Sequence, residues 1–338
     1  MKKIYITVDV ECHNLDEENL YIYGKIGDKK YGIEKIMDIG DEFGIPINFF
    51  VNLVERHKYP EDYVQRIIDT IKNRNHPIYL HLHPSCIAQD GRPFFWHYSK
   101  EEQDKIMKIG FDDYKSYLNK DSVAFRAGSY SADQNMYDSL SKQANNIVDL
   151  SYCYDYKKMC HYYPKVINQA HYNNKVFVLP NTRYRSLDFL GKRKYNNLDV
   201  NSSFYAEMKD IIKTNPLNHL VCTMHSWNLV NSWFYKGKTM KPHRRNIRKM
   251  KKLIKFAQAN GYEFSSFDNF DYLIDEKDYD FNLCKGFFKK IRGLIFSFFR
   301  MQRVAKSNKK YLKIYSLFYG LLFALLAGII VLIILLNI

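Results

Sequence analysis

The chain has 338 residues, which is long enough to bury one large core or two modest ones. Its formal net charge is +15 at pH 7. Ten lysines or arginines and no acid lie between residues 281 and 313, which leaves 41 basic against 36 acidic residues elsewhere. Because that balance is ordinary for a globular domain, we expect no nucleic-acid binding. The six scattered cysteines form no CxxC pair and favour reduced thiols over a disulfide framework.

The first predicted strand, residues 3–7, leads into two carboxylates, Asp9 and Glu11. Its β-branched and aromatic residues favour an extended backbone, on which alternate side chains share a face. Asp9 and Glu11 would then point the same way, while Val8 and Val10 point into the core. Two like charges at a buried strand end need a cation. The alternative for this segment alone is an exposed strand end with two solvated acids.

Helical and strand patterns alternate through most of the chain. Apolar spacing predicts helices at 33–43, 62–71, 134–142 and 245–260, and a Ser99/Glu102 capping box begins another. Short apolar or β-branched runs predict further strands at 46–51, 77–83, 122–126, 147–150, 220–225 and 262–266. This alternation is typical of an α/β fold with a parallel sheet, and we expect one domain over residues 1–275.

Chemically active side chains end four of these strands. They are Asp9 with Glu11, His81 with His83, Arg126, and His225. In parallel α/β folds, the carboxyl ends of the strands meet at one edge of the sheet, where the active sites lie. We therefore expect these side chains to form one site.

The His81-Leu82-His83 sequence places two imidazoles on one face of a strand end. With Glu11 they would supply two nitrogens and one oxygen, the composition of a catalytic zinc or similar divalent site. A His-x-His pattern alone also occurs on exposed strands. Arg126 is either a surface cation or the bidentate partner of a carboxylate. His225 is either a hydrogen-bonded core histidine or a general acid.

Four short motifs, in this order, resemble those of the polysaccharide deacetylase (NodB-homology) family of carbohydrate esterases. They are Thr-Val-Asp-Val-Glu, Tyr-Leu-His-Leu-His-Pro, Phe-Arg-Ala-Gly-Ser-Tyr and Met-His-Ser-Trp, and together they cover about residues 1–270. The resemblance implies a distorted (β/α) barrel and metal-dependent removal of N- or O-linked acetyl groups from glycans. The His-x-His-Pro pattern is similar to that of one branch of the family.

Position by position, the resemblance implies that Asp9 is the general base, that Arg126 orients it and that His225 is the general acid. The implied metal ligands are Glu11, His81 and His83. The implied ion is divalent, Zn²⁺ first, with Co²⁺, Mn²⁺ or Ni²⁺ as alternatives. The sequence departs from the common family pattern at three places. Glu11 replaces an aspartate, the two histidines are two and not four residues apart, and Gly128 replaces a proline.

The C-terminal part of the sequence has the pattern of a membrane anchor. Residues 314–336 carry no charge and are almost all apolar, so we expect a transmembrane helix at 314–337. Residues 276–313 predict a basic amphipathic juxtamembrane segment that contacts anionic membrane lipid. Gly320, Ala324 and Gly328 form a row of small residues that favours a homodimer through this helix.

The N-terminus has no apolar stretch of signal-peptide length, and the basic cluster precedes the expected span. The positive-inside rule then predicts a single-pass protein of the inner or plasma membrane with a cytoplasmic catalytic domain. The expected function is removal of acetyl groups from a glycan or lipid-linked sugar precursor in cell-envelope polysaccharide metabolism. The alternatives are a sugar deformylase or other amidase, and a catalytically inactive glycan-binding scaffold of envelope assembly.

Overall fold

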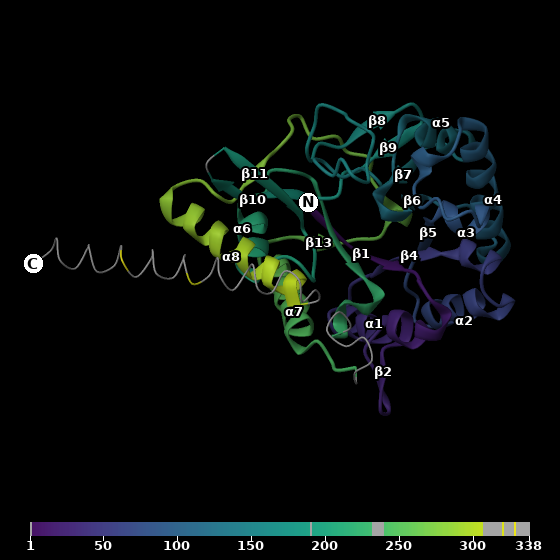
Figure 1. Ribbon diagram of the computed structural model, residues 1–338, viewed down its shortest axis with the longest axis horizontal. Coiled ribbons are helices and arrows are strands. Elements are labelled where there is room, and N and C mark those ends of the chain that lie inside the picture. The colour runs from purple at the N-terminus through teal and green to yellow at the C-terminus, as the bar shows by residue number, and fades with distance from the viewer. Residues whose placement is uncertain (1, 190, 232–239, 307–319, 321–327, 329–338) are drawn as a thin grey trace, which may run out of the picture.

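The computed structural model describes residues 2–189, 191–231, 240–306, 320 and 328 (Figure 1). Its main element is a sheet of nine strands. They are β1 (Lys3–Val10), β4 (Asn48–Asn52), β5 (Ile78–Leu82), β6 (Ala124–Ala127), β7 (Ile147–Asp149), β8 (His171–Asn173), β9 (Val176–Val178), β12 (His219–His225) and β13 (Glu263–Phe264). The order is β12-β1-β4-β5-β6-β7-β9-β8, with β13 also paired to β1, and only β8 and β9 pair antiparallel. The sheet has the expected α/β organisation, but it is a curled half-barrel, because its edge strands β8 and β12 do not pair with each other within the described residues.

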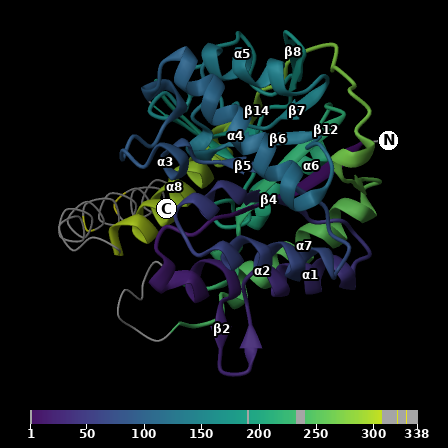
Figure 2. The same cartoon turned by 90° about the vertical axis from the view of Figure 1, so that its right-hand side faces the viewer.

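Helices cover the outside of this sheet. They are α1 (Ile33–Glu42), α2 (Glu61–Lys72), α3 (Pro84–Ala88), α4 (Lys100–Leu118), α5 (Gln134–Gln143), α6 (Tyr205–Thr214) and α7 (Arg244–Ala259), whereas α8 (Phe287–Lys306) packs elsewhere. Figure 2 shows α1, α2 and α7 together along one side of the sheet. The predicted capping box is present, because Ser99 and Glu102 bond reciprocally at the start of α4.

β1 is an interior strand, and its alternating side chains build two different cores. Ile4, Ile6, Val8 and Val10 belong to the large core that the sheet shares with the covering helices. Tyr5 faces the inside of the curled sheet, where it belongs to a smaller core made largely of aromatic and β-branched side chains. The members of that inner core include Phe50, Tyr79, Val221, Phe267 and Phe270. The inside of the half-barrel therefore has an apolar floor below the ends of the strands.

A second sheet, absent from the sequence predictions, stands beside the half-barrel. It contains β10 (Arg183–Phe189), β11 (Lys192–Asn197) and β14 (Phe281–Asn282). The yellow helix α8 lies beside this sheet, on the side of the molecule opposite α2 and α4 (Figure 1). Phe296 of α8 stacks on Phe204 with a centroid distance of 4.2 Å. The domain limits expected from the sequence stay predictions, but the described residues after 275 contact the domain.

The predicted membrane anchor is corrected. Within residues 2–306, and at the two isolated described positions, the structure contains no helix with the length and apolarity of a bilayer span. α8 is 20 residues long, but it carries several basic side chains, and its Arg300 is buried against Glu207 of the domain. Apart from Gly320 and Gly328, the expected span at 314–337 lies outside the described residues. The C-terminal transmembrane helix and the membrane localisation are therefore not supported, and neither are lipid binding or a homodimer through that helix.

Two ion pairs join α8 to α6, and we expect them to differ in their contribution to stability. Arg300 and Glu207 are buried, whereas Arg292 and Asp210 are each 28% exposed. Arg300→Leu would leave a buried carboxylate without its cation and should lower the free energy of unfolding by about 3–5 kcal/mol. The matched change Arg292→Leu should cost about 1 kcal/mol or less. Urea unfolding of the two variants measures the difference, and equal losses would contradict this account of how α8 is held.

Candidate active site

The ends of four strands carry the residues that the sequence predicted to form one site. In the register of the sheet, Asp9 of β1 lies beside His225 of β12, and His81 of β5 lies beside Arg126 of β6. Glu11 and His83 each follow the last residue of a strand, β1 and β5 respectively. Five of the six predicted side chains line one pocket, and Arg126 is buried behind them. Tertiary structure thus brings together segments up to 216 positions apart in the sequence, from Asp9 to His225.

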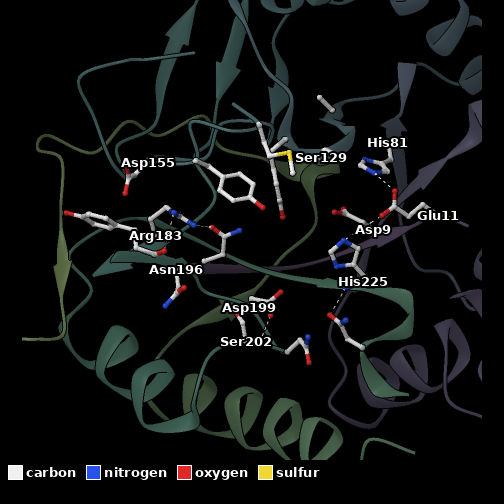
Figure 3. Close-up of a pocket in the computed structure, with 18 of the residues that line it drawn as sticks. Asp9, Glu11, His81, Ser129, Asp155, Arg183, Asn196, Asp199, Ser202 and His225 are labelled. Atoms are coloured by element: carbon white, nitrogen blue, oxygen red, sulfur yellow. Dashed lines mark hydrogen bonds and ion pairs between the residues drawn. The ribbon is translucent and has the colours of Figure 1, made fainter. Parts of the chain in front are cut away.

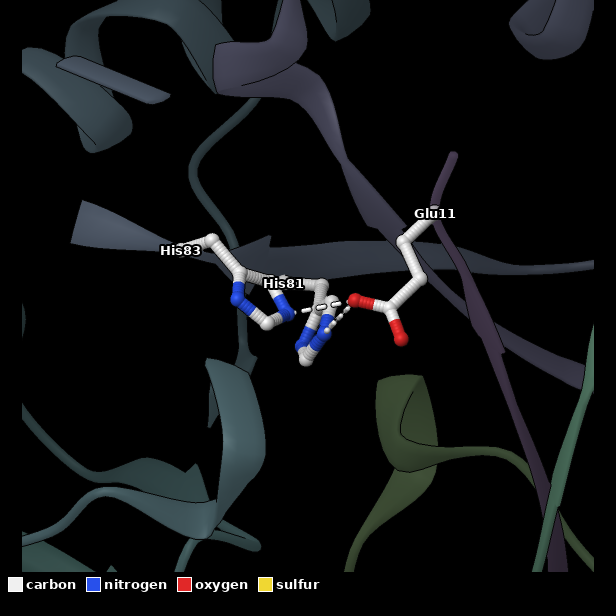
Figure 4. Close-up of side chains that lie close together, drawn as sticks. All are labelled: Glu11, His81 and His83. Carbon is white, nitrogen blue, oxygen red and sulfur yellow. Dashed lines mark ion pairs between the residues drawn. The ribbon is translucent and has the colours of Figure 1, made fainter. Parts of the chain in front are cut away.

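Glu11, His81 and His83 form a compact cluster of candidate metal ligands (Figure 4). One oxygen or nitrogen atom from each residue lies within 4.8 Å of the others. Glu11 Oε2 is 3.5 Å from His81 Nε2 and is also paired with His83 Nε2. Although it faces this carboxylate, the buried His83 Nε2 has no hydrogen bond of acceptable geometry. A cation held between the three side chains would satisfy that nitrogen, so the donor set fits a divalent metal.

Hydrogen bonds hold the ring of His81 and the main chain of His83. His81 Nδ1 lies 2.9 Å from the carbonyl oxygen of Arg126, so Nδ1–H donates there and Nε2 keeps a free lone pair toward Glu11. The backbone N–H of His83 donates to Asn52 Oδ1 at 3.2 Å. Asn52 in turn donates to the buried carboxylate of Glu55 at 3.0 Å. These contacts orient the His81 ring and fix the main chain at His83.

Two buried carboxylates near the cluster have opposite pKa shifts. Burial acts to raise the pKa of Glu11, but the electrostatic and hydrogen-bond interactions with His83 and His81 outweigh it and hold this pKa well below its ordinary value. Burial raises the pKa of Glu55 to about 7, although the N–H of Cys12 and the amide of Asn52 act in the other direction. Glu11 therefore offers the charge that a metal needs, whereas Glu55 supports the end of β1 with its Oε1, 2.8 Å from Cys12 N.

Asp9 is held separately from the ligand cluster by a buried arginine. Arg126 is 0% exposed, and its Nη1 donates to Asp9 Oδ1 at 2.5 Å. Its Nη2 donates to Thr7 Oγ1 at 2.9 Å, and its guanidinium lies 4.5 Å from the ring centre of Phe50. Asp9 lines the pocket next to Glu11 but is not one of the three clustered ligands. The carboxylate is thus oriented by the guanidinium while it still lines the pocket, where a substrate or water can reach it.

His225 faces the same cluster from β12. Its Nε2 is 3.7 Å from Glu11 Oε1, and its ring packs against Trp227 at 4.6 Å between centroids. No hydrogen bond or ion pair joins His225 to the buried Asp149 among the described residues. Instead, the carboxylate of Asp149 accepts from Tyr137 Oη at 2.8 Å and from the backbone N–H of Ser151 at 3.0 Å.

A tight turn after β6 forms another part of the pocket wall. A Cβ atom on Gly128 would lie 2.4 Å from the His83 ring, so only glycine permits this approach. Ser129 and Tyr130 both have φ of 56°, in the left-handed region that costs about 1–3 kcal/mol for such residues. Strain of this kind is concentrated at functional sites, and both residues line the pocket.

The pocket has a volume of about 670 Å³ and a second, polar wall that the sequence did not predict. Figure 3 shows Arg183 and Asn196 on the side opposite Glu11 and His81. This wall comes from β10, β11 and the loops around them, and it contributes Asp155, Tyr156, Arg183, Lys194, Tyr195, Asn196 and Asn197. It has no short motif of its own, because its residues meet only when the two sheets pack together.

One further histidine near the ligands also escaped the sequence prediction. His13 Nε2 is 4.0 Å from Glu11 Oε1, and His13 lines the pocket. Its ring packs edge-on against Tyr21 and Trp227. The alternation Asp9, Glu11, His13 carries the signal that could have identified it, because every second residue of an extended segment shares a face.

Replacement of Gly128 tests how closely the turn fits His83. Gly128→Ala should displace the His83 ring and lower Zn²⁺ affinity by about tenfold or more, comparable to losses at residues that orient metal ligands. Competition with a chromophoric chelator measures the affinity, and circular dichroism checks the fold. In a His83→Ala background, the added methyl group should have little further effect. Unchanged Zn²⁺ affinity in the single variant would contradict the predicted clash.

No protein-family model and no curated protein matches the chain. The solved structures that resemble it include polysaccharide deacetylases and members of carbohydrate esterase family 4. A candidate polysaccharide deacetylase from Mycobacterium smegmatis is 14% identical with a TM-score of 0.45, over 77% of this chain and 84% of that one. A family 4 esterase from Streptomyces lividans in complex with acetate is 7% identical with a TM-score of 0.42, over 79% and 95%. A family 4 pseudoenzyme from Bacillus anthracis is 10% identical with a TM-score of 0.40, over 78% and 63%. The motifs of the sequence resemble the same family, while the assignment to its His-x-His-Pro branch stays a prediction.

Proposed function

We propose that the protein is a metal-dependent hydrolase that removes acetyl groups from a glycan. One observation carries the proposal: a buried two-histidine, one-carboxylate cluster has beside it a second carboxylate, Asp9, that is held by Arg126 and left out of the cluster. A purely structural metal site has no need for a separate, oriented base at its edge. An inactive glycan-binding scaffold has no need for it either.

Glu11, His81 and His83 would hold a divalent ion, with Zn²⁺ as the first candidate and Co²⁺, Mn²⁺ or Ni²⁺ as alternatives. Bound there, such an ion would supply Lewis-acid chemistry for an acyl oxygen and a water molecule. His81 Nδ1–H, bonded to the Arg126 carbonyl, would keep the ligand nitrogen in the required tautomer.

The remaining steps belong to the side chains around the cluster. Asp9 would take the proton of the attacking water, with Arg126 holding the carboxylate in position. His225, on the neighbouring strand, would give a proton to the departing amine or alcohol of the sugar. Backbone N–H groups of the strained turn at Ser129 and Tyr130 would stabilise the developing oxyanion.

The pocket supports a sugar as the substrate. Its far wall offers side-chain amides from Asn196 and Asn197 and the aromatic rings of Tyr156 and Tyr195. Amides suit the hydroxyl groups of a sugar, and aromatic faces suit its C–H surface. Formyl groups fit the same chemistry, so a sugar deformylase remains the alternative reaction. A role in cell-envelope polysaccharide metabolism stays a prediction.

Acyl release from defined substrates tests the proposal. The purified chain is incubated with acetylated chito-oligosaccharides, with and without chelator, and products are analysed by mass spectrometry. We expect loss of acetyl mass that the chelator abolishes and Zn²⁺ restores. Release of formyl groups from a formylated analogue, but not of acetyl groups, would favour the alternative. No acyl release from either would contradict the hydrolase assignment.

Variants of the two acids should separate the roles of base and ligand. Asp9→Asn should lower turnover by about 10²–10⁴-fold, because an amide cannot take the proton, and should leave Zn²⁺ bound. Glu11→Gln should lose both Zn²⁺ and turnover, because it removes a charged ligand. Metal content by mass spectrometry and rates of acetate release measure both properties. If Asp9→Asn loses the metal and Glu11→Gln retains it, the roles are reversed.

A further inference from the structure

Three arginines are buried in the part of the chain that the structure describes, and they differ in their partners. Arg126 pairs with Asp9, and Arg300 pairs with Glu207. Arg183 is 5% exposed, yet none of the ion pairs among the described residues includes it. Because an unpaired buried charge is costly, this arginine is an exception that needs an explanation.

The partners of Arg183 are neutral. Its Nη1 donates to Asn197 Oδ1 at 2.6 Å, and its Nη2 lies 3.3 Å from the carbonyl oxygen of Tyr195. Its Nε is buried without a hydrogen bond. The Tyr156 ring lies 5.9 Å from the guanidinium carbon. These contacts position the guanidinium but do not balance its charge.

The lack of a carboxylate partner is specific to Arg183 and does not extend to its neighbour on the strand. Arg185, two residues further along β10, pairs with both Asp188 and Asp280. The backbone at Arg183 is fixed, because its N–H donates to Asn168 Oδ1 at 2.6 Å and its carbonyl accepts from Asn168 Nδ2 at 2.9 Å. The side chain is thus presented by a rigid strand and, unlike its neighbour, left without an anion.

Arg183 also lines the pocket of the candidate active site, on the wall opposite the ligand cluster (Figure 3). Arg193 and Lys194 of β11 line the same wall and add positive charge. Besides Asp9 and Glu11, two further acids line the pocket. Asp199 accepts from the backbone N–H of Ser202 at 2.6 Å, and Asp155 forms no ion pair with Arg183 in the described structure.

We propose that Arg183 binds an anionic group, a carboxylate or a phosphate, carried by the substrate at the end of the pocket away from the acyl group. This inference rests on the proposed function and narrows the substrate to an acidic or phosphorylated acetylated sugar. Two of the five N–H groups of Arg183 have partners, and its planar fork matches both anions. The bound anion would supply the negative charge that no side chain of the described residues provides to Arg183.

Binding measurements on the full chain test this inference without depending on catalysis. The probes are N-acetylglucosamine, N-acetylmuramic acid and N-acetylglucosamine 1-phosphate, which carry no anion, a carboxylate and a phosphate respectively. Isothermal titration is performed before and after addition of Zn²⁺. We expect at least one anionic probe to bind about tenfold more tightly than the neutral sugar, since hydrogen bonds to charged groups are worth about that factor. The anionic probe that binds more tightly shows whether the recognised group is a carboxylate or a phosphate.

Variants assign the preference to Arg183. Arg183→Gln should reduce it to about twofold or less, whereas Arg183→Lys should retain part of it because the charge remains. The control Lys192→Gln removes one positive charge from the same hairpin at an exposed position outside the pocket, and should keep the full preference. Circular dichroism checks that each variant folds.

Three results would overturn the inference. They are equal binding of all probes by the wild-type chain, a preference that survives in Arg183→Gln, and a preference that Lys192→Gln removes equally. The first result is measured on the wild-type chain, so the inference can be contradicted even if Arg183→Gln does not fold. The outcome for the proposed function is separate. An Arg183-dependent preference without acyl release contradicts the hydrolase only, and acyl release without any preference contradicts the anion site only.

Discussion

The buried contact between Arg126 and Asp9 is the interaction on which the rest of the site depends. The guanidinium is fully enclosed, lies over the Phe50 ring and reaches across the inside of the curled sheet from β6 to β1. The same residue acts a second time through its backbone, because its carbonyl accepts the Nδ1–H of His81. One position therefore orients both a candidate base and a candidate metal ligand. The cost of burying Arg126 is offset because Asp9 matches its charge and Thr7 and the Leu150 carbonyl accept from its other N–H groups.

The architecture places this pair at a boundary between apolar and polar layers. Below it, Tyr5, Phe50, Tyr79 and Phe267 fill the inside of the half-barrel. Above it, the strand ends open into the pocket. The low dielectric of the floor strengthens the electrostatic contacts of the layer above, and the floor keeps water out from below. This arrangement suits a site in which Glu11 must remain ionised despite its burial, with the two histidines beside it.

The second sheet changes what the pocket can recognise. Without β10 and β11, the strand ends would present only the candidate catalytic and metal-binding side chains. With them, the pocket gains amides, aromatic rings and the unpaired Arg183. α8 packs on this sheet, where Arg300 donates to Tyr184 Oη of β10 at 3.1 Å and pairs with the buried Glu207 of α6. The basic C-terminal region, whose pattern suggested a membrane-bound segment, thus contributes a helix to the support of the pocket wall.

The sequence by itself determined the alternation of strands and helices and the order of the motifs at the strand ends. It did so because strand period, helix period and capping are local properties, as in residues 3–7 and in the Ser99/Glu102 box. The position of Asp9 and Glu11 on one face also followed from that period. Tertiary structure alone decided that Asp149 bonds Tyr137 and Ser151 and not His225, and that Arg183 has no carboxylate partner among the described residues. It also decided that the basic residues of α8 pack on the domain. These features depend on which distant segments meet, and neither hydropathy nor spacing records the partner of a buried charge.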